Sequence, residues 1–258
     1  MIKGFALLLL IPSFATFAET PEEKGLAVAV ETDKRDSGWV DSSNDLKMIL
    51  RNAQGQESKR DIRLRSLEVQ GDGDKSLSIF DTPNDVKGTA FLNFTHATEA
   101  DDQWLYLPAL KRVKRISSSN KSGPFMGSEF AFEDLSSQEV EKYTYKWLRD
   151  EVLEGRNCFV VERYPEYKHS GYKHLVVWTD KEIYQPLKIV YYDRKDALLK
   201  TLTFHDYSQY IGQYWRPARQ EMINHQNEKN TTLLWNNYQF KTGLTDRDFD
   251  RNTLKRGR

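Results

Sequence analysis

The chain has 258 residues, with 38 basic side chains, 38 acidic side chains and one cysteine. The balanced charge does not favour nucleic-acid binding, and the single cysteine excludes an internal disulfide. The length is sufficient for one domain with a sizeable core.

Residues 1–18 have the pattern of a secretory signal peptide. Lys3 provides a positive charge, residues 5–11 are apolar, and small side chains stand at the two positions that a signal peptidase reads. We therefore expect cleavage after Ala18 and an exported, soluble protein with a single domain over residues 19–258. No cysteine follows the apolar run, so the sequence predicts no lipid anchor at this end.

A helix is expected to begin after Thr20. Thr20 can cap the helix, a proline suits the next position, and Glu23 completes a capping box. Leu26, Ala27 and Val30 would share the buried side. Two interpretations remain open: an ordinary helix packed on a sheet, or a helix that closes the mouth of a cavity.

Beyond this helix, apolar side chains alternate with a period of two, which indicates strands. Short strands separated by tight turns, such as the one at residues 71–74, favour an antiparallel meander. A change of parity at Ser66 predicts a β-bulge, which bends a sheet. Strands continue over residues 143–240, and the charged tail that follows has only Phe249 and Leu254 as apolar anchors.

Residues 104–135 are the most informative stretch. A short strand comes first and ends at Pro108, which cannot donate to a sheet ladder. A basic run and a polar Ser/Asn/Gly loop follow, and Phe125 and Met126 stand at the end of that loop. Long loops that carry aromatic and sulfur side chains are more often functional than accidental.

This stretch reads LYLPALKRVKRIS, then the polar loop, then FMGSEFAFEDL. It resembles the signature of the bacterial outer-membrane lipoprotein-sorting proteins, relatives of the periplasmic carrier LolA, whose domain also occurs in treponemal proteins. The resemblance implies an α+β, mainly β fold, in which a strongly curved antiparallel sheet forms an open half-barrel with helices and a loop over its concave face. It also implies a cavity for lipid or lipoprotein acyl chains and association with transporters of the RND/MMPL type.

Two groups of side chains are candidate binding residues in such a protein. The cavity or gate would be formed by Trp104, Tyr106, Phe125, Met126, Phe130, Phe132, Tyr143, Tyr145 and Trp147. A cationic rim that meets lipid head groups, a membrane surface or an acidic partner would be formed by Lys111, Arg112, Lys114 and Arg115. The alternative interpretations are a plain core for the first group and protection of an edge strand for the second.

Catalytic and metal-binding patterns are absent from the sequence. The five histidines are scattered without zinc-ligand spacing, and there is no Gly-x-Ser-x-Gly elbow or glycine-rich phosphate loop. The apolar neighbours of Cys158 indicate a buried, inert thiol. Asp72 and Asp74 imitate a calcium loop, but Pro83 stands where its closing glutamate would be. We therefore expect neither an enzyme nor a metal or cofactor.

The sequence thus favours a periplasmic carrier or adaptor for lipids or lipoproteins. Each methylene of an acyl chain left in water costs about 0.8 kcal/mol, so crossing an aqueous compartment requires an enclosing apolar surface. Transient membrane contact is expected, and nucleic acid is not. The alternative is an interaction protein that carries nothing, such as a transporter scaffold or an adhesin.

Overall fold

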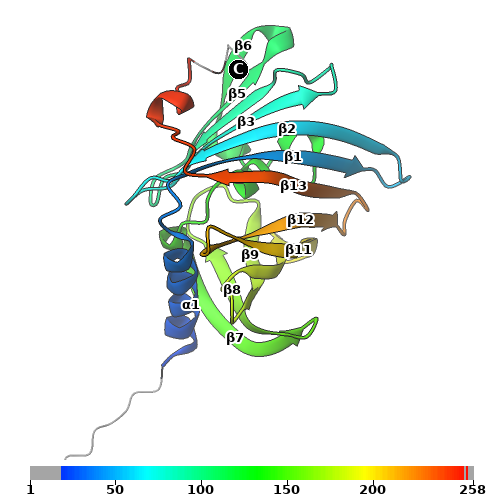
Figure 1. Cartoon of the computed structure of the whole chain (residues 1–258). Coiled ribbons are helices and arrows are strands. Elements are labelled where there is room, and N and C mark those ends of the chain that lie inside the picture. Colours follow the sequence, from blue (N-terminus) through cyan, green and yellow to red (C-terminus); the bar gives the residue numbers. More distant parts are fainter. Residues whose placement is uncertain (1–18, 253, 255–258) are drawn as a thin grey trace, which may run out of the picture.

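The computed structural model describes residues 19–252 and 254, and the expected signal peptide lies outside these residues. One α-helix and one antiparallel sheet make up most of the described chain (Figure 1). The sheet has thirteen strands in the order β6-β5-β4-β3-β2-β1-β13-β12-β11-β10-β9-β8-β7. Because β6 and β7 lie at opposite ends of this order, the sheet is an open half-barrel, and the predicted fold class is confirmed.

The α-helix is α1, Pro21–Asp36. The strands are β1 Asp41–Arg51, β2 Glu57–Leu67, β3 Lys75–Thr82, β4 Ala90–Phe94, β5 Asp102–Leu107, β6 Arg112–Ile116, β7 Tyr143–Leu153, β8 Arg156–Pro165, β9 Tyr172–Asp180, β10 Pro186–Asp193, β11 Leu198–Tyr210, β12 Tyr214–Asn224 and β13 Asn230–Phe240. Short 3-10 helices occur at η1 Pro108–Leu110, η2 Ser118–Asn120, η3 Phe125–Gly127, η4 Phe132–Leu135, η5 Val140–Lys142 and η6 Asp246–Phe249.

The two halves of the chain build the two halves of the sheet. Strands β1 to β6 run from the centre to one edge, and β7 to β13 return from the other edge to the centre, where β13 pairs with β1. The segment between β6 and β7, residues 117–142, therefore joins one edge of the half-barrel to the other. We call this segment the crossing loop.

The N-terminus of α1 has the predicted capping box. The backbone N–H of Glu23 donates to the Thr20 hydroxyl over 3.1 Å, and the backbone N–H of Thr20 donates to the Glu23 carboxylate over 2.8 Å. These two bonds satisfy backbone donors that a helix start would otherwise leave free. The helix therefore begins where the sequence predicts.

The buried side of α1 differs from the prediction. Leu26 and Val30 are 45% and 47% exposed, whereas Gly25, Val28 and Ala29 face the sheet. A Cβ atom at Gly25 would lie 2.8 Å from the backbone nitrogen of the β7 residue below it, closer than van der Waals contact allows. Small residues therefore face the sheet because α1 packs closely on β7.

The curvature comes from register shifts at positions other than the predicted one. The pairing of β2 with β1 runs without a shift, and β2 passes Ser66 in continuous register with β3. The prediction of a bulge at Ser66 is therefore wrong, because the apolar side chain of Leu67 faces the opposite side of the sheet and packs there. Shifts occur between β1 and β13 at Ser43/Asp45 and between β7 and β8 at Trp147/Arg149.

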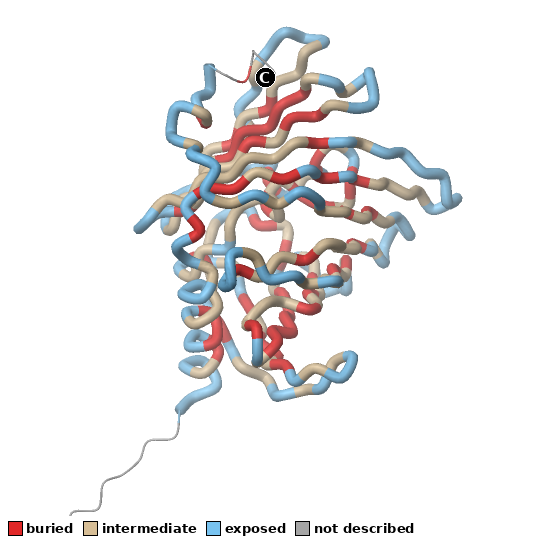
Figure 2. Tube along the Cα trace, in the orientation of Figure 1, coloured by how far each residue is buried: buried red, intermediate tan, exposed pale blue. Residues whose placement is uncertain are grey.

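Buried residues occur on both faces of the sheet (Figure 2). The largest cluster lies on the concave face and includes Met48 and Met222. On the convex face, β3 and β4 are covered by the C-terminal segment through Phe249 and Leu254, each 1% exposed. The two apolar anchors predicted for the tail are therefore confirmed.

Candidate functional site

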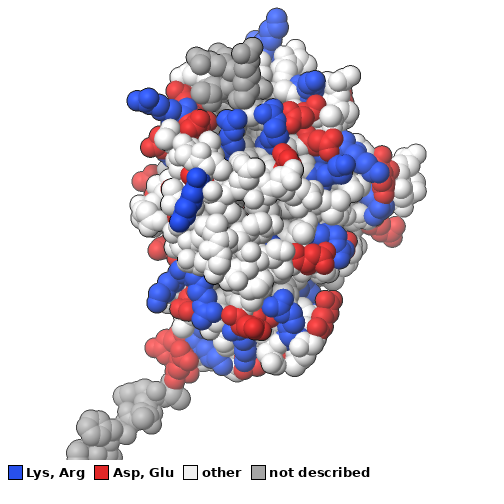
Figure 3. Space-filling model, viewed as in Figure 1, with Lys and Arg blue, Asp and Glu red and all other residues white. Residues whose placement is uncertain are grey.

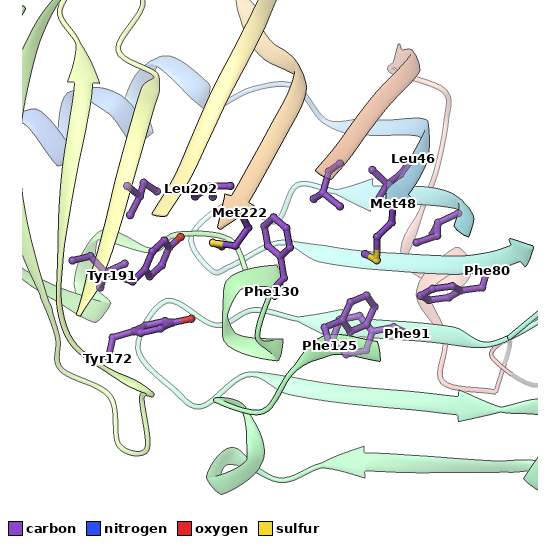
Figure 4. Packing of buried hydrophobic residues seen from close by; sticks show 14 of the residues in the cluster. Leu46, Met48, Phe80, Phe91, Phe125, Phe130, Tyr172, Tyr191, Leu202 and Met222 are labelled. Carbon is purple, nitrogen blue, oxygen red and sulfur yellow. The ribbon is translucent and has the colours of Figure 1, made fainter. Parts of the chain in front are cut away.

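The crossing loop carries aromatic side chains into the concave face. Phe125 and Phe130 are both buried and lie among side chains of the sheet (Figure 4). The Phe125 ring centre lies 5.2 Å from that of Phe91, 5.9 Å from that of Phe80 and 5.5 Å from that of Phe132. Ring pairs at such separations are favourable beyond their buried area. This part of the loop therefore fills one half of the hollow.

A buried ion cluster fixes both ends of the crossing loop. The carboxylate of Asp101, just before β5, binds the ammonium groups of Lys121 and Lys142, and the Lys121 pair is 2.7 Å long. Burial alone would raise the pKa of Asp101, but the two lysines hold it below its ordinary value. All three side chains are buried. Removing one partner of a buried ion pair is strongly destabilising, so the loop ends are firmly held.

A second cluster fixes the middle of the crossing loop. Asp134 pairs with Lys200 of β11 at 2.6 Å and accepts a hydrogen bond from the Tyr172 hydroxyl at 2.7 Å. Next to it, the Glu133 carboxylate accepts hydrogen bonds from Tyr167, from the Ser170 hydroxyl and from a backbone N–H. Burial raises the pKa of Glu133, and the nearby charge of Asp134 adds to the rise. A polar pocket of about 300 Å³ lies between these two clusters.

A larger cavity of about 760 Å³ occupies the rest of the hollow. The sheet contributes apolar side chains such as Ile189 and Leu233 to its wall. Helix α1 contributes Ala29, and the crossing loop contributes Phe125 and Phe130. The volume lies in the range of about 300–1,000 Å³ that is typical of ligand pockets. The hollow is therefore only partly filled by the protein's own side chains.

One end of this cavity is acidic. Its wall there includes Asp33 and Asp36 of α1, Glu68 and Asp74 near the ends of β2 and β3, and Glu139 of the crossing loop. Burial raises the pKa of Asp74 to about 7, with smaller contributions from the other carboxylates. Burial also raises the pKa of Asp33, Asp36 and Glu139. This end combines an apolar hollow with carboxyl groups that hold protons more strongly than usual.

Strands β12 and β13 have eleven residues each but pair over only five residues of each strand, and we call this joint the seam. Residues 219–223 pair with residues 230–234, and no further pair joins these two strands in the described chain. Beyond this seam, β12 continues beside β11 as far as Tyr214, and β13 continues beside β1 as far as Phe240. Trp235 and Tyr238 line the cavity beside the seam. The seam is thus one side of the cavity wall.

Helix α1 is attached to β12 at this seam. Arg216 pairs with Asp36 at 2.5 Å, and the Tyr214 hydroxyl donates to the Ser37 carbonyl over 3.2 Å. Strand β13 contains no charged side chain, and a largely uncharged area lies over the middle of the face seen in Figure 3. The end of α1 is therefore attached to β12 on one side of the seam, and the uncharged strand β13 lies on the other side.

Comparison with known proteins identifies the family. A family model described only as an uncharacterized protein matches residues 72–256. The solved structure of an outer membrane lipoprotein-sorting protein domain from Vibrio parahaemolyticus is 60% identical in sequence, with a TM-score of 0.89 and coverage of 91% of this chain and 99% of that one. The chain belongs to the outer-membrane lipoprotein-sorting protein family.

Two further solved structures are similar to this chain. A DUF1329 family protein from Desulfovibrio piger is 31% identical, with a TM-score of 0.87 and coverage of 91% of this chain and 99% of that one. A LolA superfamily protein from Nitrosomonas europaea shares the fold at 18% identity, with a TM-score of 0.70 and coverage of 88% and 98%. No curated protein matches the chain.

In this lipoprotein-sorting domain, several of the candidate residues lie together. Phe125, Phe130 and Tyr145 line the large cavity, and Tyr143 lines the neighbouring pocket. Met126 and Phe132 pack against the concave core without lining either space. The crossing loop and β7 thus bring these six residues to the concave face.

Three other candidates lie elsewhere. Trp104 and Tyr106 point to the convex face of β5, where they pack in the cluster under the C-terminal segment. Trp147 lies beneath α1, with the Lys24 ammonium group 3.5 Å from its ring centre, and its indole N–H donates to Asp150 over 3.1 Å. The expectation that these three residues line the cavity is wrong, because neighbouring segments cover each of them.

The four basic rim candidates lie on or beside β6, which is an edge strand. All four are exposed. Register places Arg112 and Lys114 on the concave side, whereas Arg115 lies on the convex side and pairs with Asp102. Lys111 has a left-handed backbone conformation with φ 50° at the turn into β6. Strand β6 therefore carries basic side chains on both faces of the sheet.

Sequence reasoning missed the ion clusters that hold the crossing loop. Lys121 stands in the polar Ser/Asn/Gly loop, yet its side chain is buried. Its partner Asp101 is twenty residues away, and Lys142 is a further twenty-one residues along. The acidic pair Glu133-Asp134 in an aromatic segment was the one available signal for these clusters.

In the part of the chain that the structure describes, no helix has the length and apolarity to span a membrane.

Proposed function

We propose that this protein is a periplasmic carrier or adaptor that holds acyl chains of a lipid or lipoprotein in the 760 Å³ cavity. The cavity itself carries the proposal: it lies on the concave face, the sheet contributes apolar side chains such as Ile189 and Leu233 to its wall, and α1 and the crossing loop each line part of it. Membership of the lipoprotein-sorting family supports the same function.

Delivery requires a partner and a moving part. We propose that signal cleavage leaves one domain at residues 19–258. We also propose that its partner is an inner-membrane transporter of the RND/MMPL type. Release then depends on a higher affinity of the partner for the cargo. The basic side chains beside the β6 edge are available for contact with an acidic partner or an anionic membrane surface.

One observation favours a second candidate function. Carboxyl groups such as those of Glu68 and Asp74 line one end of the cavity, and burying such groups against hydrocarbon is unfavourable. An interaction protein that carries nothing, such as a transporter scaffold or an adhesin, would tolerate this lining.

Native mass spectrometry of the protein isolated from a periplasm, followed by organic extraction, distinguishes the two functions. Stoichiometric lipid is expected for a carrier. Ser78 of β3 is half-buried and lines the cavity, so Ser78→Trp should fill the space and reduce the lipid bound. Ser58 of β2 is exposed, and Ser58→Trp is the matched control that should keep its lipid. An empty wild-type protein that also ignores fluorescent fatty-acid probes would favour the interaction protein.

A further inference from the structure

The cavity wall contains one buried cation. Arg163 of β8 is 7% exposed and lies between Tyr145 of β7 and Leu175 of β9 in the register of the sheet. Both Arg163 and Tyr145 line the cavity. The guanidinium group donates to the side-chain oxygen of Gln138 on the crossing loop. Arg163 is therefore held at the point where the sheet, the crossing loop and the cavity meet.

This cation differs from the other buried cations. Lys121, Lys142 and Lys200 each pair with an aspartate. Within residues 19–252 and 254, no carboxylate forms an ion pair with Arg163, and its Nε has no hydrogen-bond acceptor. A buried charge without an opposite charge is unfavourable, so such groups usually have a partner. An arginine also presents a planar set of donors that matches carboxylate and phosphate groups.

The surroundings of Arg163 suit a ligand with one polar end. Ile189, Tyr191 and Leu202 of β10 and β11 continue the cavity wall with largely apolar surface. A chain extending from Arg163 along these strands would lie against that surface. The guanidinium group would then meet the polar end of the chain.

Carboxyl groups face the same region from two other elements. They belong to Asp33 of α1 and to Glu139 and Glu141 of the crossing loop. Their charges raise the pKa of Tyr145, whereas the charge of Arg163 lowers it. Burial raises the pKa of Asp33 and of Glu139 above their ordinary values. None of the three forms an ion pair with Arg163 in the described structure, so no carboxylate neutralises its guanidinium group, and its Nε has no acceptor there.

We infer that Arg163 binds the anionic group, a carboxylate or a phosphate, of an amphiphile whose apolar chain occupies the cavity. This inference rests on the proposed function and adds the chemical class of the cargo. Its test compares amphiphiles with the same chain and different ends: palmitate, hexadecyl phosphate and the uncharged hexadecanol. Inorganic phosphate alone tests whether the chain is required.

The measurement is the dissociation constant of each probe for the mature wild-type chain, freed of lipid, and for Arg163→Met and Arg163→Lys. Hydrogen bonds to charged groups lead us to expect that the wild type binds palmitate or hexadecyl phosphate about tenfold or more tightly than hexadecanol. Arg163→Met should abolish this preference while still binding hexadecanol, and Arg163→Lys should keep part of it. Inorganic phosphate should bind far more weakly than hexadecyl phosphate.

Each outcome separates the inference from the proposed function. Equal wild-type affinity for palmitate and hexadecanol would overturn the role of Arg163 and leave a lipid carrier. Inorganic phosphate binding as tightly as hexadecyl phosphate would overturn the requirement for a chain. Binding of none of the probes would overturn both proposals. If Arg163→Met does not fold, the wild-type preference and the Arg163→Lys variant still decide the question.

Discussion

Replacing Phe125 by alanine tests whether the crossing loop is a structural part of the core. The Phe125 side chain is 3% exposed and meets three other phenylalanine rings at 5.2, 5.5 and 5.9 Å. Truncating a core phenylalanine costs about 3–5 kcal/mol because a cavity is left behind. For a domain of this size, each kcal/mol lowers Tm by about 2–4 °C, so we expect a fall of about 6–20 °C.

Met126 provides the control for this prediction. It is the next residue, packs at the margin of the same cluster and is half-buried. Met126→Ala should therefore lower the free energy of unfolding by about 1 kcal/mol. Urea unfolding followed by tryptophan fluorescence, with Tm from calorimetry, measures both variants. A loss for Phe125→Ala no larger than that for Met126→Ala would refute the assignment of Phe125 to the core.

Two further predictions concern buried carboxyl groups. Asp101→Asn leaves the ammonium groups of Lys121 and Lys142 without a carboxylate and should cost about 3–5 kcal/mol in urea unfolding; a loss below about 1 kcal/mol would contradict the anchoring role. Asp74 has a pKa raised from 3.8 to about 7, so the folded state keeps a proton that the unfolded chain has released between these values. The free energy of unfolding should therefore fall as pH rises through this window. Asp74→Asn should flatten this dependence. The free energy of unfolding of the variant, measured relative to wild type, should be about 4 kcal/mol higher at pH 8 than at pH 4, whereas an equal difference at both pH values would exclude Asp74 as the cause.

The sequence predicted features whose signal lies within one short stretch of the chain. The capping box needs only Thr20 and Glu23, three positions apart, and its geometry follows from local hydrogen bonding. The half-barrel was predicted through the resemblance carried by one stretch of about thirty residues. Phe249 and Leu254 stood out because they are the apolar side chains in a charged tail, and both are buried.

Predictions from the sequence were wrong where tertiary packing decides which face of an element is buried. On α1, the large side chains of Leu26 and Val30 suggested the buried face, but close packing on β7 selects Gly25 and Ala29 instead. On β5, both faces carry apolar side chains, and the C-terminal segment decides that Trp104 lies outside the cavity. The periodicity of a sequence shows which residues of an element are apolar, but it does not show which other segment of the chain will pack against them.

The crossing loop also limits how the half-barrel can deform. It tethers edge strand β6 to edge strand β7, and buried ion pairs hold it at Lys121, Asp134 and Lys142. The two rims of the sheet therefore cannot spread apart without breaking those pairs. The joint between β12 and β13 has five paired residues on each strand, and the end of α1 is attached to β12 beside it by the Arg216–Asp36 ion pair and the Tyr214–Ser37 hydrogen bond. The proposed acyl cargo would thus have to enter the cavity while the two rims stay in place.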